Sequence, residues 1–387
     1  MAQLNRKRIA LLYGSAGEGH HKAVLSLQQA LQERVPDIYA DVIDTYDFVN
    51  PFKRWQYRRA WIFASRYLSG PVRVSRDWID KNPKVVDYVQ RGFVPAAEKL
   101  ASHMRRHDIG SLVSTHPHGA GLGTIIKKKD GFGDTYLAEI FTDLRYHEFY
   151  NNRGVDHFFS ATEEAATVLK GVLPGANITV TGIPINPRFA DPISRQEARA
   201  AFGIPDDDKP VVLVTRGSAG WGSSKSLDVL RDLARSKVPM HIIAHAGQKP
   251  RLVAEMRKAL HESSPSSPGR GERDVLGWID NMWDLFEAAD LYIGKPGGMQ
   301  ISECLARSTP VLSFDPIPGT EEQNASLIEE KGAGIFLKKV EDVRPAVEAL
   351  LSDKVKLTAM REAAGRMGKP DASRAIVSHI LSDIGSG

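Results

Sequence analysis

Short apolar runs alternate with longer stretches of helical periodicity in the first half of the chain. A continuous apolar run that ends at a glycine or a polar residue is typical of a strand buried on both faces. His21–Arg34 carries its apolar residues at helical spacing and predicts a helix. The predicted strands are Arg8–Tyr13, Tyr39–Ile43, Ile109–Ser114, Thr135–Phe141, Asp156–Ser160 and Ile178–Thr181. Strands that alternate with helices indicate a parallel, doubly wound α/β sheet.

The proline-rich stretch Ile183–Pro210 interrupts this pattern and contains one predicted helix, Ser194–Phe202. Beyond it the alternation resumes, and Ser263–Glu272 is expected to be a surface loop within the second half. The predicted strands of this half are Val211–Thr215, Met240–His245, Val275–Leu276, Leu291–Ile293 and Pro310–Phe314. The pattern therefore predicts two doubly wound, Rossmann-like domains that face each other across a cleft, 1–190 and 205–370. A C-terminal helix within 371–387 is expected to pack back on the N-terminal domain.

Composition narrows the class of protein. Of 387 residues, 42% are hydrophobic and 25% charged, which excludes a disordered or fibrous chain. A formal net charge of +4 is too small to indicate a nucleic-acid-binding protein. One cysteine, Cys304, excludes an intramolecular disulfide and a cysteine-rich zinc site, and predicts a reducing, cytoplasmic compartment. No apolar run approaches the roughly 18 residues of a membrane span, and the run Ile9–Tyr13 is too short for a signal peptide.

A glycine-rich loop, Gly14–His21, joins the first predicted strand to its helix. It is not a P-loop, because His20 and His21 replace the required Lys and Ser or Thr. Its glycine order also differs from that of nicotinamide-binding loops. At a helix N-terminus the dipole would keep His20 neutral and able to act as a general base. A simple capping role for His20 in a tight turn is an equal alternative.

Two further glycine clusters, Arg216–Gly222 and Gly294–Gln300, follow predicted strands in the second half. Backbone N–H groups at a helix N-terminus bind anions, and Lys295 adds a positive charge, so the pair suits a diphosphate. The loop Asp315–Asn324 then supplies carboxylates and amides that could accept hydrogen bonds from sugar hydroxyls. Alternatively, its acids complement the dipole of a helix that starts there.

Several segments along the chain together resemble those of one known protein family. Gly294–Glu303 and Pro316–Asn324 resemble the donor-binding segment of glycosyltransferase family 28, and within it the branch of monogalactosyldiacylglycerol synthases and processive diacylglycerol glucosyltransferases. Gly14–Ala23, Ser114–Pro117, Phe141–Asp143, Gly154–Asp156 and Thr181–Pro187 resemble successive segments of the N-terminal half. The resemblance implies a GT-B fold, with an acceptor- and membrane-binding N-terminal domain and a nucleotide-sugar-binding C-terminal domain. It implies an inverting transfer of one or several hexoses from a UDP-sugar to diacylglycerol.

The resemblance also implies roles for individual residues. His20 would be the base or would orient the acceptor; Asp143 is the second choice of base, or a helix cap, and His147 a nearby alternative. Ser218 and Gly298 would contact the diphosphate, Trp278 and Ile279 the uracil, and Glu303 the ribose. Glu321, Glu322 and Asn324 would address the sugar, and the donor site would further include Gly19, Lys295, Gly297, Met299 and Ser302.

Neither a metal ion nor a cofactor is expected, apart from the UDP-sugar co-substrate. The dense acidic run Asp206–Asp208 lies in the predicted connector, and the histidines lack the spacing of a metal site. Helix N-termini and Lys295 could instead neutralise the leaving diphosphate.

The segment Lys53–Arg76 is basic and aromatic and contains no acidic residue. Such a mixture suits the surface of an anionic membrane, but also RNA, or an amphipathic helix with its aromatics in the core. With the family resemblance, the membrane is favoured over nucleic acid, on the inner face of the cell membrane. The predicted acceptor- and membrane-side residues are Arg54, Trp55, Arg58, Arg59, Trp61, Phe63 and His147.

Three other functions are also compatible with the sequence. The acceptor could be a lipid-linked peptidoglycan precursor that receives N-acetylglucosamine. The same architecture also serves UDP-sugar 2-epimerases, which have no use for a membrane surface. A nucleotide- or RNA-binding regulator would keep the glycine clusters without requiring His20.

Overall fold

The computed structural model describes residues 4–15, 17–55, 70, 74, 78, 82, 92–215, 223–262 and 273–385. The chain forms two compact units. The first comprises Met1–Pro187, Ile317–Thr320 and Asp371–Gly387, and the second comprises Arg188–Pro316 and Glu321–Pro370. The first change of unit, at Pro187 and Arg188, falls inside the proline-rich stretch Ile183–Pro210.

The first unit contains a six-stranded, all-parallel sheet in the order β2-β1-β3-β4-β5-β6. All six strands predicted for this half are confirmed, with ends that differ from the prediction by at most a few residues. They are β1 (Asn5–Tyr13), β2 (Tyr39–Asp44), β3 (Ile109–Ser114), β4 (Tyr136–Ile140), β5 (His157–Ser160) and β6 (Ile178–Val180).

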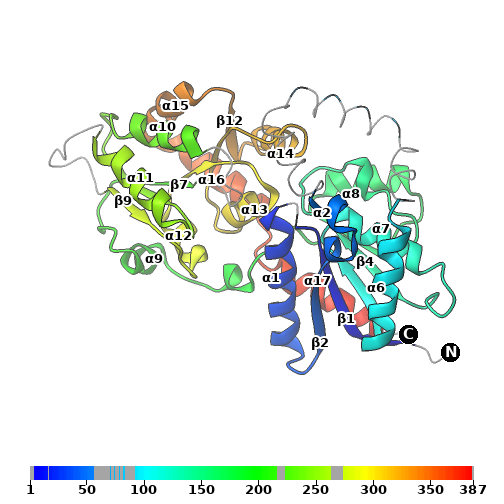
Figure 1. Ribbon diagram of the computed structural model, residues 1–387. Helices are drawn as coiled ribbons and strands as arrows, with labels where there is room; N and C mark the ends of the chain where they lie inside the picture. The colour runs from blue at the N-terminus through cyan, green and yellow to red at the C-terminus, as the bar shows by residue number, and fades with distance from the viewer. Residues whose placement is uncertain are drawn as a thin grey trace. The chain divides into compact units, whose positions relative to one another are not determined.

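Alternate residues of β1 face opposite sides of this sheet, and each side is covered by helices (Figure 1). Ile9 and Leu11 join one apolar cluster with residues of α1 and α17, whereas Ala10 and Leu12 join another with residues of α6 and α7. Burial on both faces explains why the run Ile9–Tyr13 of this strand is continuously apolar. The helices of this unit are α1 (Glu18–Arg34), α2 (Pro51–Trp55), α6 (Val94–His107), α7 (Pro117–Ile126), α8 (Glu163–Val172) and α17 (Ala372–Gly385).

The second unit contains another six-stranded parallel sheet, in the order β12-β11-β10-β7-β8-β9. Five of its strands are confirmed predictions: β7 (Val211–Thr215), β8 (His241–His245), β9 (Arg273–Leu276), β10 (Leu291–Gly294) and β11 (Val311–Phe314). The sixth, β12 (Gly334–Leu337), was missed by the sequence analysis. It is a four-residue edge strand, partly exposed over three residues, so its apolar run is too short to stand out.

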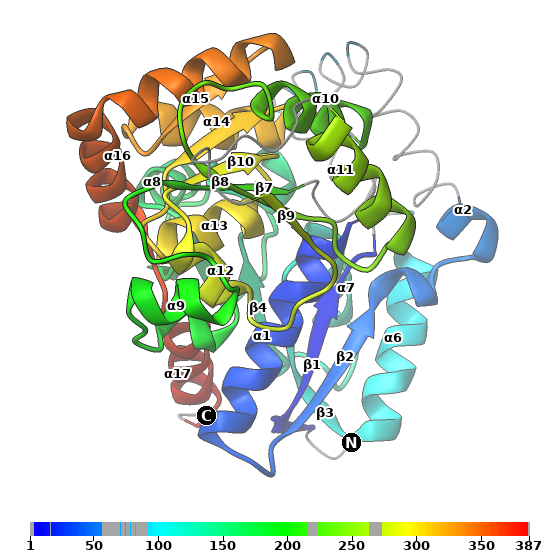
Figure 2. The ribbon, with the colours of Figure 1, turned by 90° about the vertical axis from the view of Figure 1, so that its left-hand side faces the viewer.

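Helices pack on this second sheet as well. Residues of α10, α11, α15 and α16 form one apolar cluster with the strands of the second sheet. These helices are labelled in Figure 2. Phe286 of α12 packs on Tyr292 of β10, with ring centroids 5.7 Å apart. The helices are α9 (Arg195–Ala201), α10 (Ser223–Leu233), α11 (Pro250–Glu262), α12 (Met282–Ala288), α13 (Gly298–Ala306), α14 (Thr320–Glu330), α15 (Val343–Ser352) and α16 (Lys354–Met367).

Local sequence explains the predicted helix α9. Ser194 accepts a hydrogen bond from the backbone N–H of Glu197, whose side chain bonds back to the backbone N–H of Ser194. This capping box starts the helix one residue later than predicted. The expected surface loop Ser263–Glu272 lies outside the described residues.

Both sheets reverse their strand order once. In the first sheet the reversal lies between β1 and β3, and in the second between β7 and β10. Ligands of doubly wound sheets bind outside the carboxyl ends of the strands at such a reversal. The loops after these four strands are therefore where each unit is expected to bind a ligand.

Among the helices of the described residues, none is both long and apolar enough to cross a membrane.

The C-terminal helix α17 is tied to the first sheet by a buried polar cluster. Asp383 Oδ2 accepts hydrogen bonds from the Tyr136 hydroxyl and from His157 Nδ1, each at 2.7 Å. Burial together with Asp383 raises the pKa of the Tyr136 phenol. On the other side of the same helix, Arg374 pairs with Glu33 of α1 at 3.1 Å.

Replacing Asp383 with alanine should destabilise the first unit. Asp383→Ala leaves the Tyr136 hydroxyl and the His157 ring without their shared acceptor, which typically costs about 1–3 kcal/mol. We expect a lower midpoint of thermal unfolding than for the wild type or for Ser378→Ala, an exposed change on the same helix. Equal midpoints for all three proteins would show that this cluster does not hold α17.

Candidate functional site

His20 lies in the first turn of α1, at the strand reversal of the first sheet. Its Nδ1 is 2.6 Å from the carbonyl oxygen of Thr115, the residue that follows β3. A carbonyl oxygen can only accept, so Nδ1 carries the proton and Nε2 of the neutral ring keeps its lone pair. Among the described residues, none hydrogen-bonds to Nε2. The ring is thus held in the tautomer that a general base requires.

The electrostatic environment keeps His20 neutral. Burial lowers its pKa from the usual 6.5, and His147 adds to this effect, whereas Asp143 and the bond to Thr115 oppose it. The lowered pKa agrees with the sequence prediction, although the main cause is burial rather than the helix dipole. An uncharged imidazole with an available lone pair can take a proton from a bound hydroxyl.

Other histidines surround His20. The His116 ring meets the His20 ring edge-on, with centroids 4.6 Å apart, and its Nδ1 accepts from the backbone N–H of His118. A Cβ at Gly14 would lie 3.0 Å from the His116 ring, so glycine permits this close approach. Burial lowers the pKa of His118 to about 4, and its Nδ1 contacts the Thr45 hydroxyl at 3.0 Å. Gly14 therefore makes room for the His116 ring, and the Thr115 carbonyl fixes the tautomer of His20.

The loop after β4 brings the second predicted base to the same region. Asp143 Oδ2 is 3.4 Å from His147 Nε2, and the His147 ring stacks on Tyr150 with centroids 4.1 Å apart. The Thr142 hydroxyl lies 3.2 Å from His20 Nδ1, which links this loop to the histidine. The alternative role of Asp143 as a helix cap is wrong, because no helix of the described residues begins next to it and the following short 3-10 helix is preceded by His147.

A buried carboxyl beneath this loop escaped the sequence analysis. Glu139 of β4 is fully buried, and both of its oxygens accept from the side-chain amide of Asn152, at 2.9 and 3.0 Å. Burial raises the pKa of Glu139 well above its usual value. The same Asn152 amide reaches the Phe149 carbonyl, so the pair fastens the far end of the loop to the sheet. A charged residue inside an otherwise apolar strand was the available signal.

In the second unit, the loop after β10 lies at the strand reversal beside β7. The Tyr292 hydroxyl is 2.8 Å from the Thr215 hydroxyl, which joins the ends of the two strands. A Cβ at Gly294 would lie 2.1 Å from the Tyr292 hydroxyl, so only glycine fits there. The predicted diphosphate loop thus begins at a position where the two strands are locked together by buried polar groups.

The structure brings several predicted donor residues together around this loop. Asn324 is fully buried and donates to the Pro296 carbonyl at 3.3 Å, so its amide holds the loop between β10 and α13. Glu321 and Glu322 lie in the first turn of α14, and the Glu321 carboxylate approaches Gly297. Gly298, Met299 and Glu303 are buried in α13. Lys295 is mostly buried and lies 3.8 Å from Asp315.

The other predicted residues belong to several elements or lie outside the described residues. Trp278 is 52% exposed, and its indole N–H donates to Asp280 at 2.9 Å, while Ile279 is partly buried next to it. Gly19 and Ser302 are partly buried in α1 and α13. Arg54 pairs with Asp47 at 2.8 Å and Trp55 is exposed. Ser218, Arg58, Arg59, Trp61 and Phe63 lie outside the described residues.

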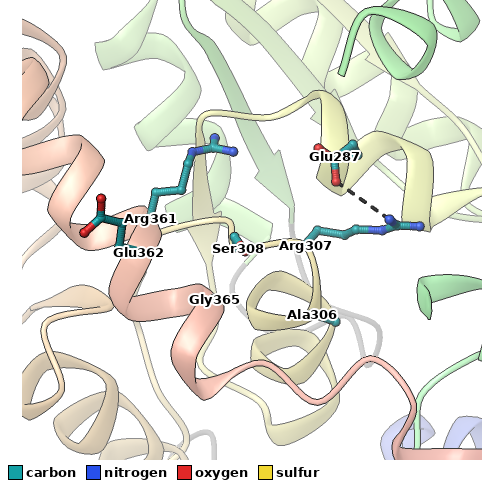
Figure 3. A pocket seen from close by; sticks show the side chains of 7 residues that line it. All are labelled: Glu287, Ala306, Arg307, Ser308, Arg361, Glu362 and Gly365. Atoms are coloured by element: carbon teal, nitrogen blue, oxygen red, sulfur yellow. Dashed lines mark ion pairs between the residues drawn. The ribbon is translucent and has the colours of Figure 1, made fainter. Parts of the chain in front are cut away.

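A cavity of about 410 Å³ opens elsewhere on the second unit, beyond the C-terminal end of α13 (Figure 3). It contains none of the residues predicted to bind the donor. Arg307 pairs there with Glu287 at 3.7 Å, and Glu362 points away from the other labelled side chains. Arg361, also on the lining, is paired with Asp290 at 3.5 Å. Within the part of the chain that the structure describes, no group of three or more His, Cys, Asp or Glu side chains could hold a metal ion.

Two family models match the chain, one for each half. Residues 20–185 match the monogalactosyldiacylglycerol (MGDG) synthase model, and residues 194–367 match the model of glycosyl transferases group 1. Among curated proteins, a processive diacylglycerol beta-glucosyltransferase of Bacillus cytotoxicus is 26% identical, and one of Bacillus cereus is 29% identical. Each alignment covers 98% of this chain and 95% of the relative.

Solved structures support the same fold. MurG of Acinetobacter baumannii superposes with a TM-score of 0.63 at 16% identity, covering 97% of this chain and 99% of that one. The S. aureus MnaA–UDP structure superposes with a TM-score of 0.61 at 15% identity, covering 98% and 97%. Likeness at this identity concerns the fold alone, and it confirms the two-domain GT-B architecture. The two family models and the curated relatives together support the resemblance to glycosyltransferase family 28, in the branch of the monogalactosyldiacylglycerol synthases and processive diacylglycerol glucosyltransferases.

Proposed function

We propose that this protein is an inverting glycosyltransferase that moves glucose from UDP-glucose to diacylglycerol, with further glucose added to the product. The observation that carries this proposal is the alignment of nearly the whole chain with relatives named processive diacylglycerol beta-glucosyltransferase. The His20 environment supports it, because the reaction needs a base for the acceptor hydroxyl. We place the reaction at the inner face of the cell membrane, since diacylglycerol resides in a bilayer.

In the proposed chemistry, His20 Nε2 removes the proton of the diacylglycerol hydroxyl. The hydroxyl oxygen attacks the anomeric carbon of the sugar as the bond from that carbon to the diphosphate oxygen breaks. UDP leaves with the bonding electrons from the opposite face, which inverts the anomeric configuration. The bond from Nδ1 to the Thr115 carbonyl would stabilise the imidazolium that forms.

The second unit would stabilise the leaving diphosphate. Lys295 and the backbone N–H groups at the start of α13 lie at the reversal between β7 and β10. A helix N-terminus and a nearby lysine provide fixed positive charge where negative charge develops. We propose that these groups make a divalent metal unnecessary.

A donor panel tests the proposed function. The protein is incubated with diacylglycerol vesicles and with UDP-glucose, UDP-galactose or UDP-N-acetylglucosamine, and the lipids are analysed by mass. We expect mono- and diglucosyl diacylglycerol from UDP-glucose. Transfer only to a lipid-linked peptidoglycan precursor, release of an isomerised free sugar, or no product at all would each contradict the proposal.

Replacing His20 tests its role as base. His20→Ala should lower kcat by about 10²–10⁴-fold, the usual contribution of a general base, with UDP affinity unchanged. His261→Ala, an exposed change on α11, should leave both quantities unchanged. Wild-type turnover in His20→Ala would exclude this histidine as base.

The pH profile separates His20 from Asp143. Only the neutral imidazole is a base, and because the pKa of His20 is lowered, the ring becomes protonated only at a pH lower than the usual 6.5. The fall of kcat/KM on the acid side should therefore lie below pH 6.5. Asp143→Asn removes an influence that raises the His20 pKa, so the fall should move to still lower pH. If Asp143→Asn instead abolishes turnover at every pH, Asp143 is the base.

Chelation tests the proposed independence from metals. With EDTA in excess, glucosyl transfer should keep its full rate, because Lys295 and the α13 N-terminus would supply the positive charge. Recovery of a lost rate by added magnesium or manganese would contradict this expectation.

A further inference from the structure

Three charged side chains meet at the carboxyl edge of the second sheet. Lys225 lies in the first turn of α10, Lys295 directly follows β10, and Asp315 directly follows β11. The Lys225 ammonium donates a hydrogen bond to Asp315 Oδ1. The Lys295 ammonium is 3.8 Å from the other oxygen, Oδ2. One carboxylate therefore lies between two lysines that belong to different segments of the chain.

The backbone of Asp315 is left-handed. Its φ of 52° lies in a region that Asp and Asn adopt more readily than most residues with a side chain. The Asp315 side chain is 19% exposed and that of Lys295 is 12% exposed, whereas Lys225 is 52% exposed. Water therefore screens the inner pair less than the outer one.

Two lysines share one carboxylate in this triad. The three side chains lie at the edge where the second sheet is expected to bind its ligand. A diphosphate carries more negative charge than one carboxylate and can accept hydrogen bonds from both lysines. The triad is therefore suited to exchanging its internal anion for a bound one.

We propose that Lys225 is a further diphosphate-binding residue and that Asp315 is the counter-ion that holds Lys225 and Lys295 when no donor is bound. The proposal rests on the proposed function, because it takes the diphosphate of a UDP-sugar as the anion. On binding, the two ammonium groups turn from Asp315 to the phosphate oxygens. When UDP leaves, the ammonium groups of Lys225 and Lys295 pair with the Asp315 carboxylate again. This renewed pairing would favour product release.

The first test removes Lys225. In titration calorimetry, Lys225→Ala should raise the Kd of UDP about tenfold or more, as expected for the loss of a hydrogen bond between charged groups. The Kd of uridine, which has no phosphate, should not change. Lys356→Ala replaces an exposed lysine on α16 and should leave both constants unchanged.

The second test neutralises Asp315 without changing its shape. Asn is also tolerated at this φ, so Asp315→Asn should preserve the backbone. Because the competing charge is removed, the Kd of UDP should fall by about two- to fivefold, the range of a partly exposed ion pair. The Kd of uridine should again stay constant, and UDP should inhibit the transfer reaction more strongly.

The outcomes separate this inference from the proposed function. If the wild type binds UDP and Lys225→Ala binds it equally well, Lys225 is not a diphosphate ligand and the inference is wrong, while the proposed function stands. If Asp315→Asn weakens UDP binding, Asp315 is a structural anchor rather than a competing counter-ion. Failure of the wild type to bind UDP at all would overturn the proposed function itself.

Discussion

The chemistry of this protein depends on one topological constraint, the reversal of strand order within each parallel sheet. The connections from the strands on either side of the reversal run over opposite faces of the sheet. The loops after these strands therefore diverge, which leaves their backbone and side chains accessible to a ligand. In the first sheet these loops carry His20 and Thr115, and in the second they include Lys295. A glycine at each place, Gly14 or Gly294, allows a bulky ring to approach the backbone closely.

The region around His20 and the region around Asp315 require opposite electrostatic environments for their proposed roles. Around His20, burial disfavours positive charge, and a single backbone carbonyl fixes the proton on Nδ1. Around Asp315, the ammonium groups of Lys225 and Lys295 share one carboxylate. A base must start neutral, whereas a site for a diphosphate must start positive. Local burial and charge therefore suit each site to its proposed step.

Buried polar contacts keep these loops in place. The Glu139–Asn152 pair holds the end of the loop that carries Asp143, and the amide of Asn324 holds the loop that carries Lys295. Removing one member of such a pair leaves a buried group unsatisfied, which costs more than the bond itself contributes. Rigid loops of this kind limit the reorganisation required when a substrate binds.

The sequence by itself determined the class of the fold and the location of its loops. Strands buried on both faces, such as Val211–Thr215, are apolar up to a polar last residue, so their positions are visible without a structure. Eleven of the twelve strands of the described residues were found in this way. The edge strand Gly334–Leu337 was not, because its apolar run is short and half exposed.

Only the tertiary structure decided how the side chains of those loops interact. The tautomer of His20 depends on the carbonyl of Thr115, which is 95 residues away in the chain. Asp315 meets a lysine 90 residues away, and no local pattern marks either partner. Periodicity reports which face of an element is buried, because burial acts on each element separately. Contacts between loops depend instead on the order in which the sheet assembles its strands, which the local pattern does not contain.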